Sequence, residues 1–315
     1  MKAFVKSFIK KKPLGKASAK ETFRESFIKA QSAMEYLMTY GWAILIIAVV
    51  LAALFQLGVF NPMTFAPKAP PGACQVFRPN GPYTTSFINL EGICSGELPQ
   101  YVAQFNNGTD TYIIRPNGPY AYGTNPFSWS LWIKTTQLNS YLISQNRDKS
   151  NYNNEAILQV SNGKIYYWDY GSSSYGIQLY SNKAINDGLW HFVVFVRNGN
   201  TGYIYIDGQL NNQITGNVVS IQDAYSFILG SDYRDNNLFF NGSMANVQIY
   251  NTSLSANEIQ ALYLEGIGGA PIDLQHLVGW WPLNGNANDY SGNGNNGQAS
   301  NVNFVSNWYN GYTPP

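Results

Sequence analysis

Histidine and cysteine are the scarcest residues of this sequence, with two of each among 315 residues. Both histidines, His191 and His276, stand far from the cysteines, so the ligand spacing of a zinc site is missing. The sequence also lacks a Gly-x-Ser-x-Gly motif, a phosphate-binding loop and the alternating carboxylates that glycoside hydrolysis would require. His191 lies within an apolar run and is interpreted as a core residue. We therefore expect no enzyme activity, with glycan hydrolysis as a remote alternative.

Charged residues are also few, at 12% of the chain, and they are unevenly placed. Residues 1–30 hold nine basic and two acidic side chains, a net charge of +7, so the rest of the chain carries −6 against the total of +1. A basic segment beside an apolar helix indicates an orientation with the positive end inside. The acidic, aromatic-rich remainder argues against a nucleic-acid partner.

One long apolar run, GWAILIIAVVLAALFQLGVF, covers residues 41–60 and ends at Asn61-Pro62. A helix of about 20 apolar residues is long enough to cross a bilayer. A secretory signal peptide has a shorter basic segment, and its apolar run is only about 7–15 residues long. We therefore predict a single membrane helix over residues 31–60, with the following residues outside the cell.

The junction between the basic leader (residues 1–30) and this helix resembles the class III signal peptide of archaeal type IV pilin-like proteins. The resemblance implies that a prepilin-type peptidase cuts between Ala30 and Gln31, and that Glu35 pairs subunits during self-assembly into a filament. Ala30 stands where glycine is commoner, and Ala33 stands where the family carries serine. The alternative is an uncut membrane anchor with Glu35 at the interface.

Residues 61–99 form a proline-rich spacer that contains Cys74 and Cys94. Because disulfides persist in oxidising compartments outside the cell, we expect these two cysteines to form one. It would close a loop of about 20 residues. Two free thiols are the alternative.

From residue 100 onward the sequence predicts strands. Short alternating runs rich in aromatic residues are separated by Gly, Asn and Asp, and they cover residues 126–135, 164–171, 189–199, 202–210, 225–231 and 244–250. Such spacing is typical of an all-β sandwich or jelly roll. Asp207-Gly208 predicts a hairpin turn. Residues 254–263 predict a helix, in which Ser255 and Glu258 form a capping box.

The runs FSWSLWIKT, DGLWHFVVFV, YIYIDGQL and FNGSMANVQIY resemble a laminin-G-like, concanavalin A-like jelly-roll module over residues 100–265. Asn246 stands where members of the family usually carry an acid. Residues 266–315 contain VGWWPLNGNANDYSGNGNNG, which resembles the strand that opens such modules. We expect this C-terminal strand and loop to complete the sandwich of their own chain, with exchange into a neighbouring subunit as the alternative.

Two binding features follow from residue types. Asp289, Asn293 and Asn295 alternate in a glycine-rich loop, a pattern of oxygen ligands that suits Ca²⁺; a hydrogen-bonded turn is the alternative. Tyr167 and Trp168 lie in an aromatic run whose two faces point in opposite directions. One face belongs to the core, and the other is a candidate for stacking on a sugar.

Three Asn-x-Ser/Thr sequons fall in predicted loops and are candidates for glycosylation: Asn107, Asn241 and Asn251. Together these features predict a cell-surface adhesion or recognition protein whose lectin-like head binds a glycan or a protein. We expect it in the cell membrane as a single-pass protein, or in an extracellular filament. The alternative is a structural pilin or envelope subunit without a specific ligand.

Overall fold

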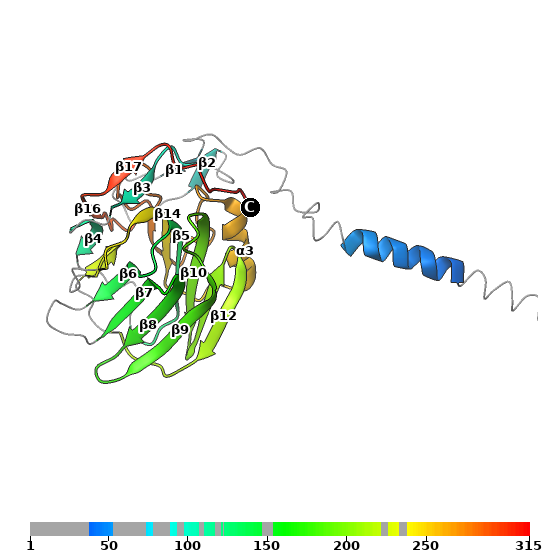
Figure 1. The fold of residues 1–315 in the computed structure, drawn as a ribbon, viewed down its shortest axis with the longest axis horizontal. Helices are drawn as coiled ribbons and strands as arrows, with labels where there is room; N and C mark the ends of the chain where they lie inside the picture. Colours follow the sequence, from blue (N-terminus) through cyan, green and yellow to red (C-terminus); the bar gives the residue numbers. More distant parts are fainter. Residues whose placement is uncertain are drawn as a thin grey trace, which may run out of the picture. The chain divides into compact units, whose positions relative to one another are not determined.

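The computed structural model describes residues 38–52, 98–106, 110–116, 121, 123–146, 154–221, 226–232 and 238–315, together with the backbone of two short strands, β1 and β2. The chain divides into two compact units, Met1–Pro62 and Met63–Pro315. Each is described by itself below (Figure 1).

Residues 38–52 of the first unit form an α-helix. Its large apolar side chains are exposed, among them Trp42 and the consecutive residues Ile44, Leu45, Ile46 and Ile47. Within the described part of the chain, no helix reaches the length and apolar character needed to cross a membrane. Ala30, Gln31 and Glu35 lie outside the described residues, so the membrane helix over residues 31–60 and its processing stay predictions.

A small hairpin begins the second unit. β1 (Cys74–Phe77) pairs antiparallel with β2 (Asn89–Gly92), and Cys74 stands opposite Gly92. Cys94 lies outside the described residues, so the disulfide also stays a prediction.

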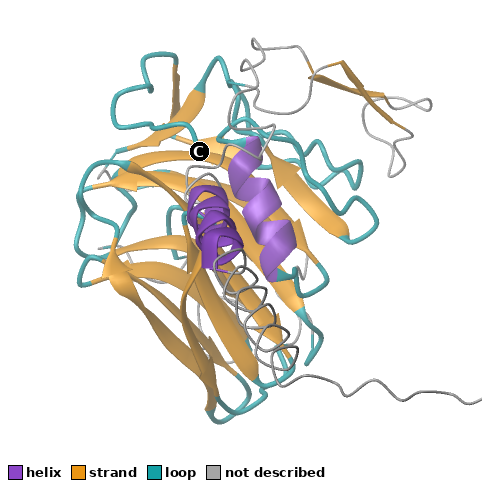
Figure 2. Cartoon of the chain, turned by 90° about the vertical axis from the view of Figure 1, so that its right-hand side faces the viewer, coloured by secondary structure: helices purple, strands orange, loops and turns teal. Residues whose placement is uncertain are grey.

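The head consists of two antiparallel sheets (Figure 1; Figure 2). The strands of the first sheet are β3 (Val102–Phe105), β5 (Phe127–Thr135), β10 (Trp190–Asn198), β11 (Thr201–Ile206), β12 (Gln209–Thr215), β14 (Gly242–Tyr250), β15 (Leu277–Trp281) and β17 (Asn303–Val305). Their order is β12-β11-β10-β5-β14-β3-β17, and β15 also pairs with β14.

The strands of the second sheet are β4 (Tyr112–Pro116), β6 (Ser140–Asn146), β7 (Glu155–Ser161), β8 (Lys164–Tyr170), β9 (Tyr175–Ala184), β13 (Ser226–Leu229) and β16 (Gln298–Ser300). Their order is β16-β4-β13-β6-β7-β8-β9, so β9 is an edge strand. The predicted all-β jelly-roll sandwich is confirmed, and every strand run predicted from the alternating pattern overlaps a strand.

Local sequence explains one hairpin turn and the start of one helix. Asp207 and Gly208 join β11 to β12 with φ values of 53° and 75°. A two-residue hairpin turn of this kind needs positive φ at both positions, which Asp-Gly supplies. α3 (Ala256–Glu265) begins after the N-cap Ser255, and Glu258 completes the predicted capping box.

The central strands β5, β10 and β14 of the first sheet are buried on both faces. The inner face of this sheet packs against the second sheet through aromatic residues such as Trp129 and Phe195. Its outer face carries a second apolar cluster, in which Ile259 and Leu262 of α3 accompany Trp132 of β5 and Trp308 of the C-terminal segment. This double burial explains why β5 and β10 are almost continuously apolar rather than alternating.

The C-terminal segment contributes strands to both sheets. β15 pairs with β14, β17 pairs with β3, and β16 pairs with β4. Trp281 of β15 is buried in the core, where its ring stacks on Phe227 at 5.6 Å between centroids. The segment thus completes its own sandwich, which is the intramolecular arrangement of the two that the sequence allowed.

Candidate functional site

The outer face of the second sheet carries a group of aromatic side chains on β8 and β9. Burial alternates along β8: Ile165, Tyr167 and Asp169 are buried, whereas Tyr166, Trp168 and Tyr170 are partly exposed. The register with β9 sets Tyr180 opposite Tyr166, Gln178 opposite Trp168 and Tyr175 opposite Tyr170. The aromatic face is defined here as Tyr166, Trp168, Tyr170, Tyr175 and Tyr180.

Ring contacts hold this face together. The rings of Tyr166 and Tyr180 stack with centroids 4.0 Å apart and planes at 11°. Tyr175 lies edge-on to Trp168 at 6.0 Å and to Tyr170 at 4.8 Å. Tyr175 is 50% exposed and Tyr180 is 43% exposed. Because β9 is the edge strand, these rings present apolar surface at the rim of the sheet.

Polar groups accompany the rings. The Tyr166 hydroxyl donates a hydrogen bond to Gln178 Oε1 at 3.1 Å. Burial, followed by the neighbouring Tyr180 and Tyr175, raises the pKa of Tyr166 to about 12. The hydroxyl therefore stays a donor over the whole physiological range. Rings with a few polar partners are the usual lining of a small-molecule site.

The prediction that Tyr167 stacks on a ligand is wrong. Tyr167 is fully buried, and its ring stacks on Phe195 with centroids 3.4 Å apart. The cause is the two-residue period of a strand, which points Tyr167 into the core and its neighbour Trp168 outward. Trp168 lies on the exposed side, so ligand stacking by Trp168 stays a prediction.

A buried ion pair lies beneath the aromatic face and joins the two sheets. Asp169 Oδ2 of β8 lies 3.5 Å from an Arg197 guanidinium nitrogen of β10, and both side chains are 1% exposed. Asp169 also accepts hydrogen bonds from Ile177 N at 2.6 Å and from the Tyr167 hydroxyl at 3.1 Å. Burial raises the pKa of Asp169 to about 6, although Arg197 opposes the rise.

Sequence reasoning missed this pair, yet a signal was present. Asp169 lies two residues after Tyr167, and Arg197 lies two residues after Phe195, so each shares the inward face of its strand. The remaining Arg197 donors reach the carbonyls of Gly123 and Asn125, each at 2.8 Å. The guanidinium also lies 4.8 Å from the centre of the Phe127 ring.

The proposed calcium loop is a closely hydrogen-bonded turn. Asp289 Oδ1 accepts from the amides of Trp280 and Ser291, and Oδ2 accepts from the Ser291 hydroxyl and the Asn295 amide. The side-chain amides of Asn293 and Asn295 donate to the Val278 carbonyl. A cation bound to Asp289 would have to displace several of these donors. Calcium binding in this loop stays a prediction. Among the described residues, no cluster of His, Cys, Asp and Glu has the arrangement of a metal site.

Asn246 fills its position with an amide for a visible reason. Its Oδ1 accepts a hydrogen bond from Trp280 Nε1 at 2.8 Å, and its Nδ2 donates to the Gly269 carbonyl at 2.8 Å. A carboxylate could not make the second bond, because it has no hydrogen to donate. The departure from the family pattern is thus matched to the Gly269 carbonyl, to which only an amide can donate.

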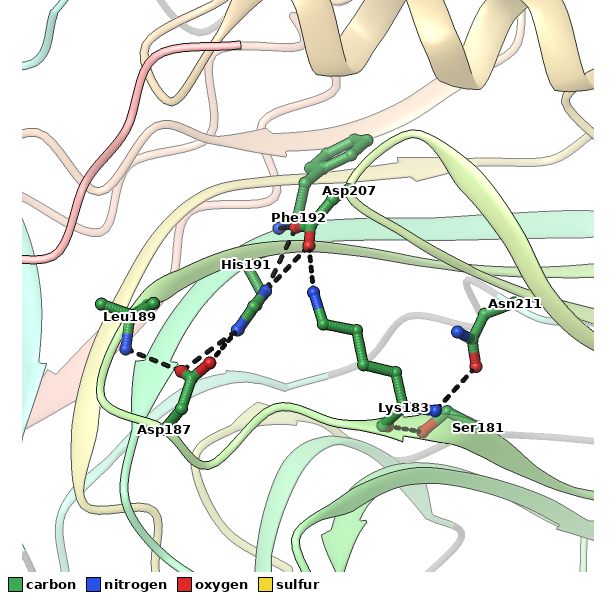
Figure 3. A network of polar contacts seen from close by, with 8 residues as sticks. All are labelled: Ser181, Lys183, Asp187, Leu189, His191, Phe192, Asp207 and Asn211. Carbon is green, nitrogen blue, oxygen red and sulfur yellow. Dashed lines mark hydrogen bonds and ion pairs between the residues drawn. The ribbon is translucent and has the colours of Figure 1, made fainter.

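His191 lies between two carboxylates (Figure 3). Its Nδ1 is 2.9 Å from Asp207 Oδ2, and its Nε2 is 3.2 Å from Asp187 Oδ1. Lys183 Nζ is 2.8 Å from the same Asp207 oxygen. His191 is buried, as expected, but it sits in a polar network rather than against apolar neighbours. Because both ring nitrogens face carboxylates, neither is directed at a hydroxyl or thiol.

The network shifts the pKa values of its members. Burial by itself would lower the pKa of His191, but the hydrogen bond and charge of Asp207 outweigh it and raise that pKa. Burial likewise opposes, without preventing, the lowering of the pKa values of Asp187 and Asp207 by their donors. The network therefore favours a charged histidine that ties the hairpin turn of Asp207 to the start of β10.

The glycosylation candidates divide by position. Asn241 and Asn251 are exposed, as an acceptor for an oligosaccharide must be. Asn107 lies outside the described residues. Glycosylation at all three stays a prediction.

Comparison with known proteins agrees with this fold. Residues 107–260, just under half of the chain, match the family model described as the concanavalin A-like lectin/glucanases superfamily. An alignment of 157 positions, which covers 45% of this chain, shows 32% identity to the Fat-like cadherin-related tumor suppressor homolog of Drosophila melanogaster. The matched stretch spans 3% of that much longer protein.

Two solved structures are similar to this chain at low identity. A candidate carbohydrate-binding protein from Bacteroides ovatus superposes with a TM-score of 0.50 and 15% identity, over 66% of this chain and 60% of that one. The IT-sialidase CBM40 of Ruminococcus gnavus gives a TM-score of 0.43 and 18% identity, over 53% of this chain and 98% of that one. At such identities the likeness concerns the fold alone. The head of this chain is therefore a jelly-roll sandwich, and its residues 107–260 are similar to the concanavalin A-like lectin/glucanases superfamily.

Proposed function

We propose that this protein is a cell-surface recognition protein whose jelly-roll head binds a glycan on the aromatic face. The observation that carries the proposal is the set of five rings on the outer side of β8 and β9, two of them about half exposed. A sugar ring presents a flat array of C–H groups that packs on an aromatic ring, while its hydroxyls need hydrogen-bond partners. Gln178 and the tyrosine hydroxyls supply such partners beside the rings.

The relatives support the recognition class without deciding the ligand. One solved structure of this fold is described as a candidate carbohydrate-binding protein, and the Drosophila relative is described as cadherin-related. A protein ligand is therefore the second outcome to be tested. A head that only decorates an assembled surface would bind neither class of ligand.

The N-terminal part of the proposal is an anchor. Residues 38–52 are helical, and four consecutive apolar side chains from Ile44 to Ile47 are exposed, so every side of the helix is apolar. A helix that is apolar all round needs a bilayer or a bundle of like helices to cover it. We place the basic leader inside the cell, with processing after Ala30 and pairing of Glu35 as the steps that would lead to a filament.

The test uses the full-length chain in non-ionic detergent, applied to a glycan array and then titrated with the best ligand by calorimetry. Trp168→Ala and Tyr180→Ala are the test variants, and Tyr309→Ala is the matched control because Tyr309 is 51% exposed on another part of the head. Aromatic contacts contribute about 0.5–1.5 kcal/mol beyond the area that they bury. Since each 1.4 kcal/mol is tenfold in affinity, we expect Trp168→Ala to weaken binding about tenfold or more.

The outcomes are distinct. Binding that falls in both test variants and persists in Tyr309→Ala supports the aromatic face. Glycan binding that both variants retain places the site elsewhere, and a wild-type protein that binds no glycan contradicts the proposal. Thermal melting of each variant checks that a loss of binding is not a loss of folding.

A further inference from the structure

A second, polar groove lies on the first sheet, which does not carry the aromatic face. Its volume is about 270 Å³. Side chains from three neighbouring strands line it in one row, because Ser243 of β14 stands opposite both Gln104 of β3 and Lys134 of β5. Residues more than 100 positions apart in the chain thus meet across the strands.

The C-terminal segment walls the groove with Trp308 and Asn307. Trp308 is buried and held at both ends: its Nε1 donates to the Pro99 carbonyl at 3.0 Å, and its own carbonyl accepts from Trp190 Nε1 at 3.1 Å. Asn241 and Thr136 also line the groove. A wall fixed in this way keeps the groove open without a ligand, so ligand binding loses little conformational entropy from this segment.

The groove carries one cation and no acid. Lys134 is the only charged residue among its lining side chains. The Lys134 ammonium donates to the carbonyl of Asn310, and it forms no ion pair with any carboxylate in the described part of the chain. Since an ammonium has three hydrogens to donate, two are left for another acceptor.

Neutral hydrogen-bonding groups surround this cation. Within the described residues, no intramolecular hydrogen bond engages the side chains of Ser243, the neighbour of Lys134 in the row, and of Gln104, which follows Ser243. An amide and a hydroxyl can each donate and accept, as the hydroxyls of a polyol require. One cation beside several such groups matches a ligand with one carboxylate and several hydroxyls.

We propose that this groove binds a single carboxylated sugar residue, with Lys134 on the carboxylate and Gln104 and Ser243 on hydroxyls. The volume lies just below the roughly 300–1,000 Å³ of most small-molecule sites, which suits one sugar ring rather than a chain of them. Hydrogen bonds from a cation to a carboxylate are about twice as strong as neutral ones, so Lys134 is expected to dominate affinity. This site is separate from the aromatic face and does not depend on the function proposed above.

The experiment is calorimetric titration of the full-length chain, in non-ionic detergent, with D-glucuronate. The protein is made in a host without N-glycosylation, because Asn241 lines the groove and heads a sequon. Methyl glucoside tests the need for the carboxylate, and inorganic phosphate tests for a general anion site. Lys134→Met is the test variant, and Lys164→Met on β8 of the other sheet is the matched control.

We expect saturable glucuronate binding that weakens about tenfold or more in Lys134→Met, is unchanged in Lys164→Met and falls with added salt. Methyl glucoside and phosphate should each bind more weakly than glucuronate. If Lys134→Met melts early, Ser243→Val serves in its place and should weaken binding without removing the charge.

The proposal is overturned if the wild type shows no saturable glucuronate binding, or if the variants in the row bind it as tightly as the wild type. Methyl glucoside or phosphate binding as tightly as glucuronate would also overturn it. Loss of glycan binding in Trp168→Ala does not bear on the polar groove. The two proposals can therefore fail independently, and the variants show which of them has failed.

Discussion

Replacing Asp169 with asparagine tests how burial and ion pairing compete inside the sandwich. Burial raises the pKa of Asp169 to about 6 from its ordinary value of 3.8, with Arg197 opposing the rise. The folded state therefore holds this proton more tightly than the unfolded state does. The contribution of Asp169 to stability is present below about pH 4 and is lost as pH rises through about 6.

The magnitude follows from the two pKa values. Their difference of about 2 corresponds to about 3 kcal/mol of unfolding free energy at 1.36 kcal/mol per unit of pKa. Asparagine does not titrate, and its single side-chain oxygen can keep either the hydrogen bond from Ile177 or those from Arg197 and the Tyr167 hydroxyl. That loss is the same at every pH, so the pH dependence isolates the carboxyl group. We therefore expect the unfolding free energy of Asp169→Asn, relative to wild type, to rise by about 2 kcal/mol between pH 4 and pH 7, because the unfolded chain is already partly deprotonated at pH 4.

The assay is urea unfolding of the full-length chain in detergent, followed by tryptophan fluorescence at pH 4, 5, 6 and 7. Asp110→Asn, which alters an exposed carboxylate, is the control. The comparison between variant and wild type cancels the other titrating groups. A difference that stays constant with pH, or that falls as pH rises, would refute the reasoning and would mean that the attraction of Arg197 outweighs burial.

Two further predictions concern other parts of the chain. Because the pKa of His191 is raised and those of Asp187 and Asp207 are lowered, the stability that His191→Gln loses should be greatest between about pH 4 and 6.5 and should shrink above that window. Thermal melting against pH measures it, and a loss that grows toward pH 8 would contradict the assignment. For the anchor, we expect the mature protein from its native membrane to begin at Gln31, as N-terminal mass spectrometry would show; a chain that begins at Met1 rules out pilin-like processing.

The sequence alone determined the features that depend on near neighbours. The alternation of apolar and polar residues predicted the strand runs, Asp207-Gly208 predicted the turn between β11 and β12, and Ser255 with Glu258 predicted the helix cap. Each of these depends on residues one to four positions apart, whose types are visible in a short window. The buried face of β8 was harder to predict, because five of its seven side chains are aromatic or apolar and such residues occur on both faces.

Only the tertiary structure decided which distant residues meet. The burial of Tyr167, the pairing of Asp169 with Arg197 and the row of Gln104, Ser243 and Lys134 all follow from strand order and register. The return of β15 into its own sheet is of the same kind. Register and order are set by the joint burial of side chains from the whole sandwich, and no local pattern contains that information.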